Sequence, residues 1–151
     1  MDTRSSHRTL AELRRVARGV HPLALGHDGL AGALAALPDT WPQVSVDVDG
    51  LDDADLDDAA RTTAYLLAAE SVVNAHKHGA SPVAVTARTD GAELVLSVRD
   101  NGEGGAHLEP GGGLAGLADR AAALGGAVRM DSPAGGPTVI TLVLPSGRGE
   151  S

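Results

Sequence analysis

Four polar side chains near the middle of the chain have the types and the spacing that could hold a metal–phosphate group. Apolar residues recur at helical spacing over residues 55–78, which predicts a long helix. At about 100° per residue, four side chains fall in one sector of this helix: Glu70, Asn74, Lys77 and His78. An amide oxygen can enter the octahedral shell of Mg²⁺, and an ammonium group one turn away can neutralise phosphate. The alternative interpretation of this stripe is a solvated helix face.

Another sector of the same helix is predicted to face the core. It contains Tyr65, Ala69, Val72, Val73 and His76. Because His76 and His78 then point to different sides, they form a poor pair of zinc ligands. The other histidines are expected to be structural or exposed: His7, His21, His27 and His107.

A carboxylate at the end of a predicted strand is the second candidate. Residues 93–99 alternate apolar and polar side chains and end directly before Asp100. A carboxylate there can accept a hydrogen bond from the exocyclic amine of adenine, whereas guanine presents a carbonyl at that position. Gly102 and Gly104 follow, and such a run of glycines allows a mobile cover. The alternative interpretation of Asp-x-Gly-x-Gly is an ordinary turn.

A second glycine cluster opens the next predicted helix. Three consecutive glycines, from Gly111 to Gly113, precede Leu114, and Gly116 and Leu117 follow. Backbone N–H groups and the helix dipole at such a start could hold phosphate. The cluster is not a P-loop, because no Gly-Lys-Ser/Thr follows, and it is not a dinucleotide fingerprint, because a loop precedes it. The alternative is a flexible hinge before a helix.

The elements that must position these residues alternate irregularly. In chain order we predict a helix over residues 7–20, a short helix from its N-cap Asp28 to a stop at Pro38, a strand over 43–49, the long helix over 55–78, a hairpin of strands 81–89 and 93–99 turning at Asp90-Gly91, a loop over 101–113, a helix over 114–124, and strands over 127–131 and 138–144. This order predicts an α/β fold, a two-layer α/β sandwich in which one mixed β-sheet has helices packed on one face.

The acidic stretch before the long helix has two interpretations. Five aspartates stand close together: Asp52, Asp53, Asp55, Asp57 and Asp58. They would form either a metal site or the solvated first turn of the helix, where carboxylates suit the helix dipole. We favour the helix start.

Length and composition limit the function classes. The chain has 151 residues and no Cys, which is typical of one domain that needs no disulfides. Its formal net charge is -8, and an acidic domain repels nucleic acid and anionic lipid, so neither is expected as a partner. No apolar run reaches the ~20 residues of a membrane span, and no signal-peptide pattern opens the chain, so this part of the protein is expected to be soluble.

Taken in this order, the polar and glycine motifs resemble the four boxes of the Bergerat-fold (GHKL) ATPases. The counterpart of the N box is Glu70-x-x-x-Asn74-Ala75-x-Lys77-His78, and that of the G1 box is Asp100-x-Gly102-x-Gly104. The counterpart of the G2 box is Gly111-x-Gly113-Leu114-x-Gly116-Leu117, and that of the final Gly-x-Gly-Thr box is Gly135-Gly136-Pro137-Thr138. The resemblance covers about residues 40–145. It departs from the family pattern at Pro137, which stands where the family has a Gly, and in the short lid over residues 105–110.

The resemblance implies a role for each matching residue. Asn74 would bind Mg²⁺ through its side-chain oxygen, and Asp100 would bind the adenine of ATP. The implied catalytic set is Glu70, Asn74 and Lys77. Glu70 is ambiguous within this set, because it is a general base in ATP-hydrolysing relatives, whereas kinases are expected to place the base beside the acceptor His. The implied nucleotide-binding set is Asn74, Lys77, His78, Asp100, Gly102, Gly104, Gly111, Gly113, Leu114, Gly116, Leu117 and Thr138.

The front of the chain is similar to sensor histidine kinases of the NarL/DesK-like class. Two segments resemble the junction between the dimerisation helix and the ATP-binding domain of these kinases. They are Leu13-Arg14-Arg15-Val16-Ala17-Arg18-Gly19-Val20-His21-Pro22 and Gly29-Leu30-Ala31-Gly32-Ala33-Leu34. Asp119-Arg120, after the G2 box, is also like that class. The resemblance implies that residues 1–22 are the end of the dimerisation helix and the junction, and that residues 23–151 are the ATP-binding catalytic domain.

The implied function is that of the catalytic domain of a two-component histidine kinase. The domain would transfer the γ-phosphoryl group of ATP to a His on a dimerisation domain absent from this chain, and a response regulator would receive it next. None of the six histidines has the expected acceptor setting, an Arg-rich helical segment in which Asp or Glu follows the His. The parent is expected to be a membrane-anchored homodimer with this domain in the cytoplasm. Two alternatives stay open: a stand-alone serine kinase of the anti-sigma-factor type, and a nucleotide-binding regulatory module without transfer activity.

Overall fold

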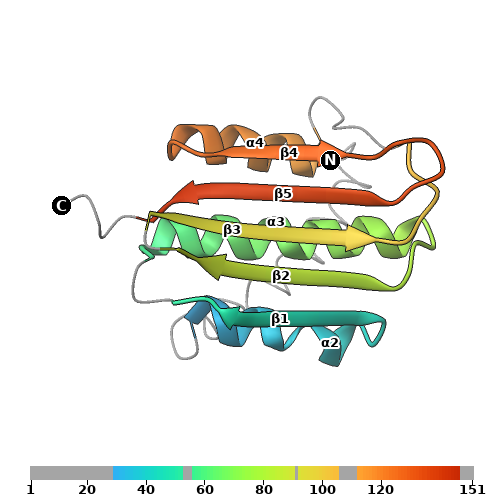
Figure 1. The fold of residues 1–151 in the computed structure, drawn as a ribbon, viewed down its shortest axis with the longest axis horizontal. Helices are drawn as coiled ribbons and strands as arrows, with labels where there is room; N and C mark the ends of the chain where they lie inside the picture. The colour runs from blue at the N-terminus through green and yellow to red at the C-terminus, as the bar shows by residue number, and fades with distance from the viewer. Residues whose placement is uncertain (1–28, 53–55, 91, 106–111, 147–151) are drawn as a thin grey trace, which may run out of the picture.

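The computed structural model describes residues 29–52, 56–90, 92–105 and 112–146 (Figure 1). The predicted helix and junction within residues 1–22, the N-cap Asp28 and Gly111 lie outside these residues. Residues 29–35 are helical, and the later elements follow in the order α2 (Leu37–Thr40), β1 (Val44–Gly50), α3 (Asp58–Lys77), β2 (Val83–Thr89), β3 (Glu93–Asp100), α4 (Gly113–Ala123), β4 (Ala127–Asp131) and β5 (Thr138–Pro145). No helix among the described residues has the length and apolar character needed to cross a membrane.

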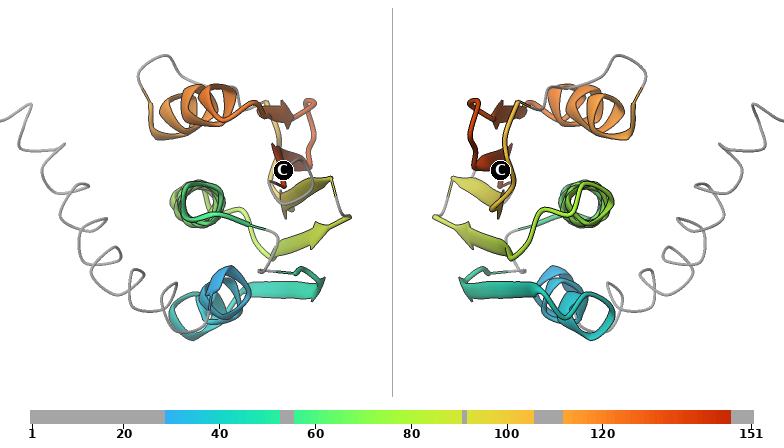
Figure 2. Two further views of the ribbon diagram at one scale, coloured as in Figure 1. Left: turned by 90° about the vertical axis from the view of Figure 1, so that its left-hand side faces the viewer. Right: turned by 90° about the vertical axis from the view of Figure 1, so that its right-hand side faces the viewer.

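The five strands form one mixed sheet in the order β1-β2-β3-β5-β4. β1 runs parallel to β2, and the other neighbouring pairs are antiparallel. Figure 2 shows α2, α3 and α4 on one face of this sheet. The predicted fold, a two-layer α/β sandwich with a mixed sheet and helices on one face, is therefore confirmed.

Alternation along the central strands decides which face of the sheet meets the helices. The buried side chains of β3 are Leu94, Leu96 and Val98. Leu144 and Leu142 of β5 stand directly opposite Leu94 and Leu96, so leucines line up across the two strands under the helical layer. Burying one such side chain contributes ~1.5–3 kcal/mol. This apolar layer holds the strand register on which the site depends.

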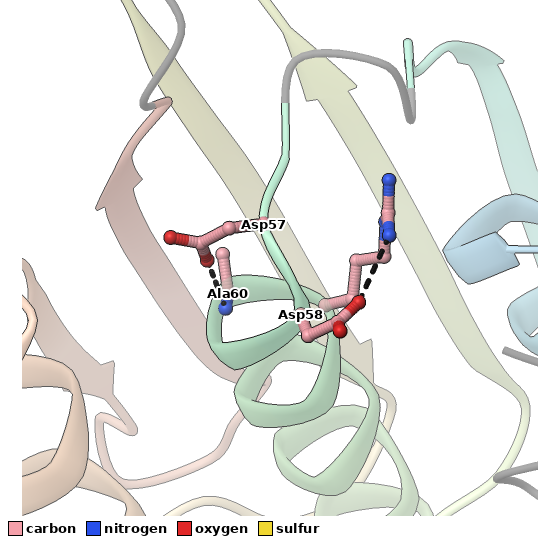
Figure 3. Close-up of polar contacts among 4 residues, drawn as sticks. Asp57, Asp58 and Ala60 are labelled. Atoms are coloured by element: carbon pink, nitrogen blue, oxygen red, sulfur yellow. Dashed lines mark hydrogen bonds and ion pairs between the residues drawn. The ribbon is translucent and has the colours of Figure 1, made fainter. Parts of the chain in front are cut away.

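The start of α3 explains part of the acidic stretch (Figure 3). Asp57 is the N-cap, and its Oδ1 accepts a hydrogen bond from the N–H of Ala60 at 2.9 Å. Asp58 lies in the first turn and pairs with Arg61 at 3.2 Å, but its side chain is 98% exposed. An N-cap of this kind is worth about 1 kcal/mol, whereas an exposed ion pair contributes little. The preferred interpretation, a helix start, is confirmed for these two aspartates.

The buried face of α3 differs from the predicted one. Of the five residues expected in the core, only Val72 is buried; Tyr65, Ala69 and Val73 are half-buried and His76 is exposed. The face that meets the sheet consists mainly of small side chains: Ala60, Thr63, Ala64, Leu67, Ala68, Ser71, Val72 and Ala75. Small residues allow the helix to lie close to the strands, and the Ser71 hydroxyl donates to the carbonyl of Leu67 at 2.7 Å, so its burial is not penalised.

Two further residues are corrected by the structure. Pro38 does not end a helix; it stands in the first turn of α2, where the missing N–H of proline has no intrahelical acceptor to lose. The helix before it ends at residue 35, with a turn at Ala36. His76 packs its ring against the indole of Trp41, with ring centroids 4.9 Å apart and an angle of 58° between the planes.

Candidate functional site

Asp100 lies where β3 ends beside the first residues of β2 and β5. It is the last residue of β3 and stands opposite Val83 of β2 and Thr138 of β5. Its Oδ1 accepts a hydrogen bond from the N–H of Gly102 at 2.9 Å, which turns the chain sharply out of the strand. The half-buried carboxylate is thus held at the start of the glycine loop.

The glycines of this loop are required by close backbone contacts. A Cβ placed on Gly104, whose φ is +77°, would lie 1.8 Å from the carbonyl oxygen of Pro133. A Cβ on Gly136 would lie 1.9 Å from the carbonyl oxygen of Gly102, and the N–H of Gly105 donates to the carbonyl of Ser132 at 2.8 Å. Residues 102–105 therefore pack backbone to backbone against the turn between β4 and β5.

Thr138 anchors that turn from inside. It is buried, and its hydroxyl lies 2.6 Å from the hydroxyl of Ser132, within hydrogen-bond distance. The N–H of Gly136 donates to the carbonyl of Pro133 at 2.9 Å, so the turn closes without the N–H that Pro137 lacks. Sequence reasoning missed Ser132; the available signal was a hydroxyl residue at the start of a Pro/Gly turn, a common arrangement.

The polar stripe of α3 runs along the edge of its buried face. Glu70 and Asn74 are half-buried, whereas Lys77 and His78 are exposed at the end of the helix. The chain then folds back so that the N–H of Ala80 donates to the carbonyl of Ala75 at 2.8 Å. This brings buried Ala80 against the glycine loop, because a Cβ on Gly102 would lie 2.8 Å from the Ala80 Cβ. Ala80 was also missed from the sequence, where nothing marks it.

The first turn of α4 lies against α3. A Cβ on Gly113 would come within 2.6 Å of Oε2 of Glu70. Leu114 is buried in the core and Leu117 packs against it, so any nucleotide contact from Leu114 would come from its backbone. A Cβ on Gly116 would point into open space, with no group of another element within 4 Å.

The structure thus places the predicted residues in two groups, with two exposed residues beyond them at the end of α3. Asp100, Gly102, Gly104 and Thr138 meet at one end of the sheet, as just described. Glu70 meets Gly113 at the α3–α4 contact, with Asn74 one turn further along α3. Lys77 and His78 extend beyond them, exposed to solvent. The predicted member Gly111 lies outside the described residues.

The donor set suits a metal held mainly by phosphate oxygens. No group of three or more His, Cys, Asp or Glu side chains is close enough to hold a metal within the described ranges. Magnesium commonly takes one or two protein oxygens and completes its shell with phosphate and water. Asn74 is the side chain of the stripe that could supply one such oxygen. Elsewhere on α3, burial raises the pKa of the Tyr65 phenol, which keeps that side chain neutral.

Two curated proteins are similar to this chain in sequence, although no family model matches it. The sensor histidine kinase MctS of Rhizobium johnstonii is 31% identical over 148 residues, which cover 90% of this chain and 32% of MctS. The nitrate/nitrite sensor protein NarQ of Escherichia coli is 42% identical over 87 residues, which cover 54% of this chain and 15% of NarQ. The chain spans about a third or less of the length of these relatives.

Solved histidine kinase structures share the fold. The histidine kinase domain of the Erythrobacter litoralis EL346 blue-light activated histidine kinase superimposes with a TM-score of 0.60 at 21% identity, over 80% of this chain and 61% of that one. Full-length ShkA in complex with AMPPNP gives a TM-score of 0.53 at 22% identity, over 78% of this chain and 29% of that one. The resemblance predicted from the sequence, to the catalytic domain of sensor histidine kinases, is confirmed by the shared fold and by both curated relatives.

Proposed function

We propose that this chain, which has the fold of the histidine kinase catalytic domain, binds ATP and phosphorylates a histidine of a dimerisation domain outside it. The observation that carries the proposal is the position of Asp100. Its carboxylate is fixed by the Gly102 N–H at the point where β3, β5 and the glycine loop meet. A nucleobase entering beside this loop would meet a rigid acceptor.

Adenine selection follows from the two oxygens of that carboxylate. Oδ1 accepts from Gly102, and within the described ranges Oδ2 accepts no hydrogen bond. Oδ2 is thus available to the exocyclic amine of adenine. Guanine would present its carbonyl oxygen to the same carboxylate, so that two acceptors would face each other without a hydrogen between them, which disfavours guanine.

The phosphates would lie along the polar stripe of α3 and the first turn of α4. Lys77 and His78 place positive or hydrogen-bonding groups at the end of α3, and the N–H groups that open α4 favour an anion. Asn74 would offer its amide oxygen to Mg²⁺ between them. When bound, Mg²⁺ would offset the negative charge of the phosphate oxygens.

The reaction would be an in-line displacement. A nitrogen of the acceptor histidine forms a bond to the γ-phosphorus while the bond to the bridging oxygen breaks, and ADP leaves. The residues of this chain would bind, orient and neutralise the nucleotide, because phosphoryl transfer needs positioning and charge stabilisation more than covalent help. The phosphoryl group would then pass to an Asp of a response regulator.

The relatives favour this function over the two alternatives. Both curated matches are bacterial sensor proteins, one of them named a sensor histidine kinase, and neither is named a serine kinase. A nucleotide-binding regulatory module without transfer activity would use the same polar stripe of α3, so the preference over this alternative rests on the relatives. From the resemblance of the front of the chain to the dimerisation junction of sensor histidine kinases, we also propose that the parent protein is a membrane-anchored homodimer with this domain in the cytoplasm.

Calorimetry with Asn74→Ala tests the proposed site. The wild type should bind ATP more tightly with Mg²⁺ than without it, and Asn74→Ala should lose most of that difference while keeping its circular dichroism spectrum, since Ala favours the helix. His76→Ala, on the same helix but outside the stripe, is the control and should bind like the wild type. A wild type that binds no ATP would overturn the proposal, and an undiminished Mg²⁺ effect in Asn74→Ala would remove the metal role of Asn74.

A further inference from the structure

The N-terminus of α4 is approached by an anion from another helix. Gly112 is the N-cap and has no side chain to bond the first turn. The carboxylate of Glu70 on α3 lies there instead: a Cβ on Gly113 would stand 2.6 Å from Oε2, 2.8 Å from Cδ and 3.3 Å from Oε1. Both carboxylate oxygens therefore face the first residue of α4.

This place favours negative charge for a simple reason. The first backbone hydrogen bond within α4 is donated by the N–H of Gly116 to the carbonyl of Gly112, at 3.0 Å. The N–H groups of Gly113, Leu114 and Ala115 come before it and have no acceptor inside the helix. Together with the helix dipole they favour an anion at this end of α4, and the half-buried Glu70 carboxylate lies against Gly113, the first residue of the helix.

We infer that Glu70 is a positioning residue that holds the start of α4 by occupying the anionic place that nucleotide phosphates take when ATP binds. The inference rests on the proposed function for its second half, the competition with phosphate. Glu70 and the triphosphate are both negative, so they cannot share this place at low cost. ATP binding then requires the Glu70 carboxylate to leave the start of α4, where the nucleotide phosphates replace it.

The contact between Glu70 and α4 also depends on the glycine at position 113, which leaves room for the carboxylate. A side chain there would collide with the Glu70 carboxylate, which is the flexible end of its side chain and would move aside. An alanine at position 113 should therefore displace Glu70 from α4 rather than break the fold. The two residues should behave as one coupled pair.

The competition is tested by nucleotide affinity. Glu70→Gln keeps the size of the side chain and removes its charge, so the affinity for ATP should rise about fivefold, whereas the affinity for adenosine, which has no phosphates, should not change. Glu93→Gln, an exposed glutamate at the start of β3, is the matched control and should leave both affinities unchanged. An ATP affinity that is unchanged or weaker in Glu70→Gln overturns the competition and favours a base or metal-shell role for Glu70.

The contact itself is tested without nucleotide, so its failure is separate from that of the proposed function. Amide hydrogen exchange of Leu114 and Ala115 in the nucleotide-free chain should speed up about threefold in Glu70→Ala. Gly113→Ala should speed it up to a similar extent, and adding Gly113→Ala to Glu70→Ala should change nothing further. Additive effects of the two substitutions, or no effect of either in folded proteins, would contradict the positioning role.

Discussion

The two carboxylate oxygens of Asp100 have different surroundings, and this difference decides what a substitution there would do. Oδ1 is engaged by the Gly102 N–H at 2.9 Å, and an asparagine could keep that hydrogen bond with its own oxygen. The second oxygen would become an amide NH₂ group, which donates rather than accepts. The turn should survive the change, while the group that faces the nucleobase becomes a hydrogen-bond donor instead of an acceptor.

Asp100→Asn should therefore abolish the preference for ATP over GTP without unfolding the chain. A hydrogen bond to a charged group is worth about 1.5–3 kcal/mol, so the ratio of the two affinities should fall about tenfold or more. Calorimetry with both nucleotides measures the ratio, and an unchanged thermal midpoint shows that the turn is intact. If the ratio is the same in wild type and variant, Asp100 does not read the base.

Single residues were predictable where a local pattern marks them. Asp100 follows an alternating strand and precedes spaced glycines, so its place at a strand end could be read from the sequence. Ser132 has only the general signal of a hydroxyl residue at the start of a Pro/Gly turn, and Ala80 has none. Both matter through contacts with Thr138 and Gly102 that the folded chain creates. The approach of Glu70 to Gly113 joins two helices 43 positions apart and has no local signal either.

At the scale of elements, the glycine loop and the turn between β4 and β5 form one unit. Gly104 and Gly105 both have positive φ, +77° and +80°, but only Gly104 has backbone atoms of the turn where a side chain would stand. A side chain at Gly105 would meet nothing within 4 Å. The pair therefore separates the conformational cost of an alanine from the cost of steric collision.

Gly104→Ala should be clearly more destabilising than Gly105→Ala. The left-handed backbone costs an alanine about 1 kcal/mol at either position, and overpacking should add roughly 2 kcal/mol at Gly104 alone. Urea unfolding of both variants measures the difference. Equal losses of stability would show that the loop and the turn are not in the contact described.

Strands were predicted more reliably than the orientation of α3. Alternating apolar residues and the Asp90 turn place β2 and β3 unambiguously, and Asp90 Oδ1 indeed accepts from the N–H of Glu93 at 3.0 Å. On α3, hydrophobicity pointed to Tyr65 and Val73, but the sheet selects small side chains such as Ala64 and Ala68 that allow close approach. Packing distance, which the sequence does not state, decided that face.

At the scale of the whole molecule, the fold gathers segments from residue 70 to residue 138 around one end of the sheet and the α3–α4 contact. The order of the four motifs along the chain predicted this gathering, because they match a known family together. The domain boundary at residue 22 stays a prediction. So do the individual roles of the site residues, which the substitutions above test.

The central claim is phosphoryl transfer to a histidine of another domain, and labelling with ATP carrying a radioactive γ-phosphate tests it most directly. The chain alone should stay unlabelled, because none of its six histidines has the acceptor setting. Mixed with the dimerisation domain of a related sensor kinase, the wild type should produce acid-labile label on that domain. Folded Asn74→Ala should produce almost none, and His76→Ala should match the wild type. Acid-labile label on a histidine of this chain alone, or equal transfer by folded Asn74→Ala and wild type, would contradict the account.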